Sequence, residues 1–149
     1  MSLPGAASLF RFPVFGWWLR AVGVVPVERS GGSAGLKTIL GRLRLGNVIL
    51  LFPEGTRTSD GRFRPAQSGI GLMVLKSGAP VVPVRVKGSF ESWGRHHGWP
   101  RPRPVSIRFG PALRFEPQLA EAQTCPKERL KELYQEVSER IMAAISALE

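Results

Sequence analysis

Residues 48–57 read VILLFPEGTR, and this stretch decides the fold class that the sequence predicts. Its first five residues are apolar and mostly branched, which is typical of a strand buried on both faces of a sheet. An acid, a glycine, a hydroxyl and a guanidinium follow within five residues of the strand's end. Because ligands of open α/β sheets bind just beyond the carboxyl ends of strands, the stretch predicts an α/β domain with a binding site at residues 54–57.

These four residues have the chemistry of an anion site. Gly55 allows a sharp turn or a close approach of the backbone to a ligand. Arg57 is suited to hold a phosphate through two parallel hydrogen bonds. Glu54 either fixes Arg57 or accepts a hydrogen bond from a substrate hydroxyl. The same residues are also compatible with an ordinary turn that carries a surface ion pair, so their spacing alone leaves both interpretations open.

On both sides of this stretch, residue patterns typical of helices alternate with residue patterns typical of strands. Apolar residues at helical spacing predict helices over residues 34–45, 68–76 and 126–148. Branched apolar runs predict further strands over residues 24–29, 81–86 and 105–109. The remaining segments are expected to form turns and loops, at residues 31–35, 53–65 and 91–104. Strands alternating with helices predict a single α/β domain over residues 1–149, with a mostly parallel sheet and flanking helices.

Composition narrows the class of protein. Of the 149 residues 43% are hydrophobic and 21% are charged, so a packed core is expected. The single cysteine, Cys125, excludes an internal disulfide framework, and with only His96 and His97 available no metal site is expected. Apolar runs fall far short of the ~20 residues that span a bilayer, and the amino terminus lacks the cation of a secretory signal. The sequence therefore predicts an intracellular, cytoplasmic domain.

Positive charge dominates most of the chain. Lysine and arginine total 21 against 11 acidic residues, which gives a net charge of +10. Residues 1–115 carry a net of +13, with 17 basic and 4 acidic side chains, and residues 116–149 a net of −3. Such a field favours a polyanionic partner, namely nucleic acid, an anionic membrane or a phosphorylated small molecule. An arginine-rich surface that only aids solubility is equally compatible with these counts.

Residues 9–23, which read LFRFPVFGWWLRAVG, concentrate bulky side chains around two charges, Arg11 and Arg20. One interpretation is a helix that packs in the core. The other is a segment that lies at a membrane surface, because tryptophan and arginine together suit the lipid interface. This second interpretation predicts a peripheral association with the anionic inner face of the membrane.

Three blocks of the sequence resemble the glycerolipid acyltransferases, the family typified by 1-acyl-glycerol-3-phosphate acyltransferase. FPEGTR at residues 52–57 resembles the third conserved block of that family. Residues 10–29 resemble the second block, an apolar helix leading to a strand that ends in arginine, and residues 81–86 resemble the fourth. The order and spacing of the blocks match over residues 9 to about 90, which makes a chance likeness improbable.

The resemblance implies a reaction and a site. The reaction, part of phospholipid biosynthesis, moves a fatty acyl group to the hydroxyl of a lysophospholipid such as 1-acyl-glycerol-3-phosphate. Acyl-coenzyme A or acyl carrier protein is the implied co-substrate, and no metal or other cofactor is expected. The implied substrate-binding residues are Arg29, Glu54, Gly55, Thr56 and Arg57.

One block of the family is absent from these 149 residues. In the family, His-x4-Asp supplies a histidine general base and an aspartate that orients it. The sole aspartate here, Asp60, precedes both histidines, so no catalytic pair is identified. We therefore expect an acyltransferase domain that lacks its first strand and catalytic loop at the amino end, with a non-catalytic phospholipid-binding remnant as the alternative. Gln67-Ser68 also departs from the Phe-Lys that the family often has.

Two further patterns point to other functions. Residues 31–35 read GGSAG and fit the G-x-S-x-G elbow of α/β-hydrolases, with Ser33 as the nucleophile. Five small residues match this pattern easily by chance, and a hydrolase sheet normally needs a longer chain. The loop at residues 91–104 mixes tryptophan, histidine and arginine, which can stack on bases or rest on a membrane. The loop alone is weak evidence, and no nucleic-acid partner is expected.

Overall fold

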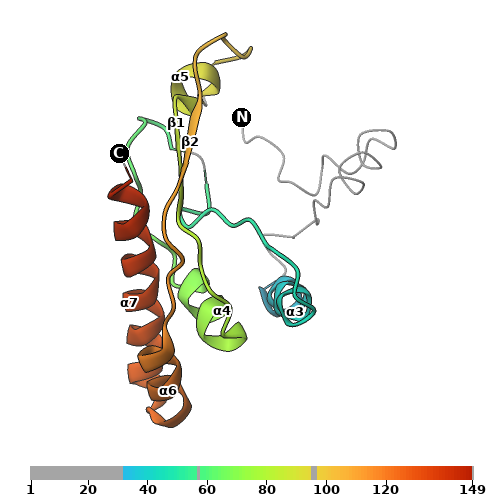
Figure 1. Cartoon of the computed structure of the whole chain (residues 1–149), viewed down its shortest axis with the longest axis vertical. Helices are drawn as coiled ribbons and strands as arrows, with labels where there is room; N and C mark the ends of the chain where they lie inside the picture. Colours follow the sequence, from blue (N-terminus) through green and yellow to red (C-terminus); the bar gives the residue numbers. More distant parts are fainter. Residues whose placement is uncertain (1–31, 57, 95–96, 149) are drawn as a thin grey trace. The chain divides into compact units, whose positions relative to one another are not determined.

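The computed structural model describes residues 32–56, 58–94 and 97–148. The chain divides into two compact units, Met1–Asn47 and Val48–Glu149, and each is described by itself (Figure 1). The strand predicted over residues 24–29 and the aromatic segment at residues 9–23 lie outside the described residues.

In the first unit the described residues form one helix, α3 (Gly32–Arg44). This confirms the helix predicted over residues 34–45, although α3 begins inside the turn expected at residues 31–35. Gly46 ends the helix with a φ of 78°, a left-handed conformation that glycine adopts without strain. The Gly46 N–H donates to the carbonyl oxygen of Leu43 at 3.0 Å, which satisfies one of the last carbonyl groups of α3.

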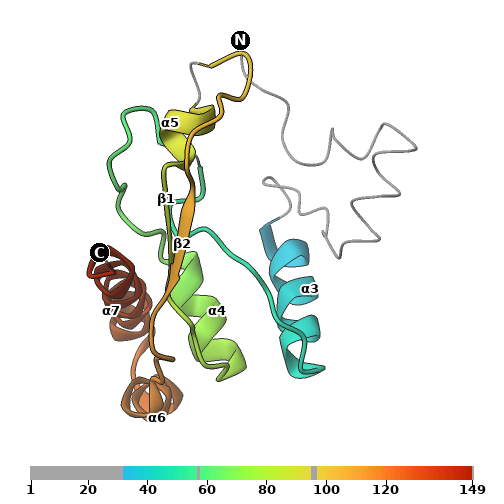
Figure 2. The ribbon, with the colours of Figure 1, turned by 45° about the horizontal axis from the view of Figure 1, so that its top comes forward.

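The core of the second unit lies between α4 (Gly69–Ser77) and α7 (Lys127–Ser146), which run side by side in both views (Figures 1 and 2). The two helices confirm those predicted over residues 68–76 and 126–148. Their buried apolar side chains, which form one contiguous cluster with Phe115, are Val74, Leu75, Leu133, Tyr134, Val137, Ile141 and Ile145. Full burial of a single leucine, valine or isoleucine stabilises a fold by about 1.5–3 kcal/mol, so this interface is the main source of the unit's stability.

Helix α6 (Glu116–Thr124) is an element that the sequence pattern did not predict. The helix buries no residue, so it lacks the apolar stripe from which a helix is predicted. It is joined to α7 by Arg129, whose Nε donates to Glu121 at 2.7 Å. Hydrogen bonds to Glu136, Glu121 and Glu132 raise the pKa of the Arg129 guanidinium. Besides this ion pair, Leu119 and Ala122 of α6 pack against the core cluster, so both kinds of contact join α6 to the rest of the unit.

The sheet of the second unit consists of β1 (Val84–Lys87) and β2 (Ser106–Phe109). The two strands pair antiparallel, with Val84 opposite Phe109 and Lys87 opposite Ser106. The positions predicted at residues 81–86 and 105–109 are thus confirmed in large part, but a mostly parallel sheet is wrong for the strands that the structure describes. The chain returns from β1 through a short helix, α5 (Ser89–Trp93), and a loop, without the crossover helix that parallel strands require.

No strand forms over residues 48–52 in the structure, contrary to the prediction. Val48, Leu50 and Phe52 are 97%, 73% and 69% exposed. Their side chains suit the interior of a sheet, but a strand also needs a neighbour that pairs with its backbone N–H and C=O groups. Within the part of the chain that the structure describes, these residues have no such strand partner.

Candidate functional site

Three of the five residues predicted to bind substrate, Glu54, Gly55 and Thr56, lie in a tight turn between residues 48–52 and α4. Gly55 has a φ of 67°, which favours glycine, and its N–H donates to the carbonyl oxygen of Phe52 at 3.0 Å. Glu54 and Thr56 are half-buried, whereas Gly55 is exposed. The turn therefore exposes backbone to solvent at Gly55, which carries no side chain.

Glu54 organises the loop that follows the turn. One of its carboxylate oxygens, Oε2, accepts a hydrogen bond from the backbone N–H of Arg64 at 3.0 Å. This contact is different from both roles considered for Glu54 in the sequence, which were support of Arg57 and binding of a hydroxyl. An ionised carboxylate has about four acceptor positions, so the bond to Arg64 leaves capacity for a second partner.

The Asp60 carboxylate accepts hydrogen bonds within the same loop. Its Oδ1 accepts hydrogen bonds from the backbone N–H of Arg62 at 3.1 Å and from the hydroxyl of Thr58 at 2.8 Å. These bonds, the one from Arg62 first, lower the pKa of the Asp60 carboxyl, because they stabilise its ionised form. Arg62 and Arg64 are exposed on this loop, so it adds positive charge next to the turn.

Gln67 fastens the turn to the start of α4. Its backbone N–H donates to the carbonyl oxygen of Pro53 at 3.0 Å. Its side-chain Nε2 donates to the carbonyl oxygen of Glu54 at 3.4 Å. A Cβ atom added at Gly55 would stand 2.3 Å from this Nε2, so the Gln67 amide lies directly against the glycine. Sequence reasoning singled out Gln67 only as a departure from the family pattern and did not foresee this contact.

Arg85 of β1 anchors the other side of the loop. Its guanidinium carbon lies 5.2 Å from the centre of the Phe63 ring, within the range of a cation–π contact. Its Nη1 donates to the carbonyl oxygens of Ser146 and Leu148, both at 2.8 Å. A cation at the carboxyl end of a helix also complements the helix dipole, so Arg85 ties the loop and β1 to the end of α7.

The structure brings three of the five predicted substrate-binding residues, Glu54, Gly55 and Thr56, together in one turn. Arg29 and Arg57 lie outside the described residues, so their convergence stays a prediction. His96 also lies outside them. His97 is half-buried, and its Nδ1 is buried without a hydrogen-bond partner in the part of the chain that the structure describes.

The hydrolase interpretation of Ser33 finds no support. Ser33 lies in the first turn of α3, whereas a nucleophile elbow holds its serine on a strained turn between strand and helix. Among residues 32–56, 58–94 and 97–148, positive φ angles occur only at glycines. Asp60, which would supply the acid of a hydrolase triad, is already bonded within its own loop.

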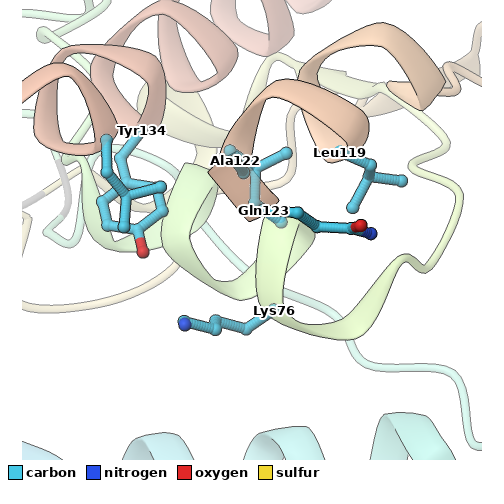
Figure 3. A pocket seen from close by; sticks show the side chains of 7 residues that line it. Lys76, Leu119, Ala122, Gln123 and Tyr134 are labelled. Atoms are coloured by element: carbon cyan, nitrogen blue, oxygen red, sulfur yellow. The ribbon is translucent and has the colours of Figure 1, made fainter. Parts of the chain in front are cut away.

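A pocket of about 350 Å³ opens between α4, α6 and α7 (Figure 3). Its walls, which combine apolar side chains with a lysine, a glutamine and a tyrosine hydroxyl, are Leu75, Lys76, Leu119, Ala122, Gln123, Leu130 and Tyr134. Burial raises the pKa of the Tyr134 hydroxyl, so this group stays neutral and polar at the rim. Of the predicted substrate-binding residues that the structure describes, Glu54, Gly55 and Thr56, none lines the pocket, so it is separate from the turn at residues 53–56.

Within residues 32–56, 58–94 and 97–148, no three histidine, cysteine or acidic side chains gather in a way that would hold a metal ion. None of the described helices combines the length and the apolar character needed to cross a bilayer.

Residues 1–87, more than half of the chain, match the profile of the family described as Acyltransferase. The matched region includes FPEGTR and ends at the last residue of β1. The chain therefore belongs to the acyltransferase family, and it is similar to proteins named 1-acyl-sn-glycerol-3-phosphate acyltransferase.

A chloroplastic 1-acyl-sn-glycerol-3-phosphate acyltransferase of Brassica napus is 37% identical over 85 residues, which are 55% of this chain and 25% of that protein. Its counterpart in Arabidopsis thaliana is 34% identical over 85 residues, which are 55% of this chain and 24% of that protein. The chain thus spans about a quarter of the length of these relatives.

A crystal structure supports the α/β fold. The 1-acyl-sn-glycerophosphate acyltransferase PlsC from Thermotoga maritima superposes with a TM-score of 0.64, covering 95% of this chain and 55% of that one, at 23% sequence identity. At this identity the likeness concerns the fold alone. It covers nearly the whole chain, including the region after residue 87 that the family profile does not match.

Proposed function

We propose that the protein transfers a fatty acyl group to the free hydroxyl of 1-acyl-glycerol-3-phosphate, from acyl-coenzyme A or acyl carrier protein. The ester forms as the thioester breaks, the thiol leaves, and a general base takes the hydroxyl proton. One observation carries the proposal: the turn at residues 53–56 is held with Gly55 exposed, in a chain whose residues 1–87 match the acyltransferase family. Because this match runs across the boundary at residue 47, we infer that residues 1–149 belong to one acyltransferase domain.

In this proposal Glu54, Gly55 and Thr56 bind the glycerol phosphate of the acceptor together with Arg29 and Arg57. A guanidinium binds a phosphate through two parallel, charge-assisted hydrogen bonds. The exposed Arg62 and Arg64 on the adjoining loop supply a positive field that draws the anionic headgroup towards the turn.

Titration with 1-oleoyl-glycerol-3-phosphate tests the acceptor site. We expect Arg29→Ala and Arg57→Ala each to weaken binding about tenfold or more, because a hydrogen bond to a charged group contributes about 1.5–3 kcal/mol. Isothermal titration calorimetry with lipid below its micelle concentration measures the dissociation constants. Arg108→Ala is the matched control, since it removes the same charge from an exposed position on β2. Equal losses in all three variants would mean that net charge alone attracts the lipid.

A second candidate function is phospholipid binding without catalysis. It is favoured by one observation, the absence of His-x4-Asp from these 149 residues. The titration above does not separate it from catalysis, because both functions use the same phosphate site. A direct measurement of turnover separates them.

We further propose that the protein works at the inner, cytoplasmic face of the membrane. The basis is the +13 charge of residues 1–115 and the aromatic segment at residues 9–23. Each basic residue close to an anionic surface contributes about 1 kcal/mol, and salt screens this term. Insertion of aromatic side chains adds a part that salt does not weaken.

Sedimentation with anionic lipid vesicles measures this association. We expect binding that weakens in high salt but persists, and little binding to vesicles of zwitterionic lipid. Double substitution of Trp17 and Trp18 by alanine should abolish the part that resists salt. Full release of the parent chain by salt would mean that these tryptophans do not insert, and equal recovery with and without anionic lipid would refute the association itself.

A further inference from the structure

Ser138 lies in the middle of α7 and is fully buried, with 0% of its surface exposed. Its oxygen accepts a hydrogen bond from the backbone N–H of Gly71 at 2.9 Å, in the first turn of α4. Its hydroxyl proton has two acceptors in reach, the carbonyl oxygen of Gln67 at 3.1 Å and that of Tyr134 at 2.9 Å. Ser68, the residue in the capping position of α4, makes no side-chain cap. A serine of α7 therefore accepts a hydrogen bond from a backbone N–H group in the first turn of α4.

The Gln67 carbonyl oxygen lies within hydrogen-bond reach of the Ser138 hydroxyl of α7, and the rest of Gln67 contacts the turn. Its backbone N–H bonds to Pro53, and its side-chain amide bonds to the carbonyl oxygen of Glu54 and lies against Gly55. Ser138 and Gln67 form a continuous line of hydrogen bonds from the core to the exposed turn.

We propose that Gln67 is the positioning residue of the turn at residues 53–56, and that Ser138 of α7 fixes Gln67 in place. Glutamine is fit for this task because one residue supplies three groups that point in different directions. Its carbonyl group faces Ser138, its N–H faces Pro53, and its amide covers Gly55. Phenylalanine at this position would keep the backbone contacts but lose the side-chain hydrogen bond to Glu54.

The consequence is that α7 contributes to the geometry of the turn although it lies beyond the region that the family profile matches. The turn includes the exposed Gly55, and an exposed turn opens locally without unfolding of the core. The fraction of time for which the turn keeps its geometry depends on how often the hydrogen bonds of Gln67 break. The importance of this geometry for acceptor binding rests on the function proposed above.

Amide hydrogen exchange of Gly55, followed by NMR, tests the positioning role without any ligand. We expect about threefold to tenfold faster exchange at Gly55 in both Gln67→Ala and Ser138→Ala, the effect of losing one ordinary hydrogen bond. Gln67→Glu keeps the shape of the side chain but removes its N–H donor, and it should also exchange faster. The matched controls are Gln123→Ala on α6 and Ser146→Ala on α7; the Ser146 hydroxyl donates within its own helix, to the carbonyl oxygen of Met142.

A purely structural role of Ser138 predicts a different result. Destabilisation of the core would raise exchange of the buried Val137 amide, which needs global unfolding, and leave the locally opening Gly55 amide unchanged. Unchanged exchange at Gly55 in Gln67→Ala, or in Ser138→Ala, overturns the proposal. Faster exchange at Gly55 in both variants, with no change in either control, supports it.

Binding of 1-oleoyl-glycerol-3-phosphate to the same variants separates the two proposals. If the parent chain binds this lipid, Gln67→Ala should weaken binding about threefold to tenfold, in line with the loss of one hydrogen bond. If the parent chain does not bind it, the acceptor site at this turn is wrong, while the exchange at Gly55 still decides the positioning role. Lipid binding that is undiminished in Gln67→Ala, despite a loosened turn, would refute the functional part of the inference.

Discussion

Replacing Gly71 with alanine should destabilise the second unit by at least about 3 kcal/mol, at the upper end of what overpacking of a core costs. A Cβ atom at this position would stand 1.9 Å from the carbonyl oxygen of Tyr134 and 2.8 Å from its carbonyl carbon. Both are backbone atoms of α7, so no side-chain rotation relieves the clash. The two helices would have to separate, which would open the cluster around Val74 and Leu133 and break the bond from Gly71 to Ser138.

Gly69→Ala is the matched control for this substitution. Gly69 lies in the same helix, two residues earlier, and a Cβ atom there would meet nothing within 4 Å. Alanine restricts the unfolded chain more than glycine does, so this variant should gain about 0.4–1 kcal/mol. Urea unfolding followed by circular dichroism measures both changes. Similar stability of the two variants would mean that α4 and α7 do not approach as closely as Gly71 requires.

The helices were predictable because each carries its pattern within one segment. Residues 126–148 repeat apolar side chains at helical spacing, and α7 buries that stripe, including Leu133, Val137 and Ile141. α4 is bounded by a glycine, and Gly78 indeed adopts the left-handed conformation that ends a helix. Pro83 lies inside the predicted strand over residues 81–86, and proline is confined to edges, bulges and strand ends because it lacks an N–H group. The structure has an isolated bridge at Val81 and a regular strand only from Val84.

The pairing of strands was not predictable in the same way, because it depends on residues far apart in the chain. An apolar run at residues 48–52 indicates that the side chains suit a sheet, but it carries no information about which neighbour is present. The direction of pairing between β1 and β2 follows from the path of the connection through α5, which contains no crossover helix. Alternation of strand patterns with helix patterns alone favoured the parallel arrangement.

In the candidate site, too, the local pattern was predictable from the sequence and the long-range contacts were not. FPEGTR marked the turn, because an acid, a glycine and an arginine directly after an apolar run form a local pattern. The contacts that hold the turn join residues up to 71 positions apart, as between Ser138 and Gln67. No local pattern connects such residues, so the support of the turn became visible only in the structure.

The 149-residue chain, purified alone, should show little or no acyl transfer. A positioned general base typically contributes about 10²–10⁴-fold to a rate, and the sequence contains no His-x4-Asp pair. The described residues offer no substitute. A histidine base needs an acceptor that orients its ring, but Nδ1 of His97 is buried without a partner and the carboxylate of Asp60 is bonded to Thr58 and Arg62.

Release of free coenzyme A from oleoyl-coenzyme A, in the presence of 1-oleoyl-glycerol-3-phosphate, measures this activity directly. The Thermotoga maritima acyltransferase, assayed under the same conditions, shows that the substrates and the detection work. We expect a rate about 10²-fold or more below that enzyme, even if calorimetry shows that the chain binds the lipid. Binding without turnover would separate the phosphate site from the catalytic base. Turnover comparable to that of the Thermotoga enzyme would require another base, and His97→Ala would then be the first variant to examine.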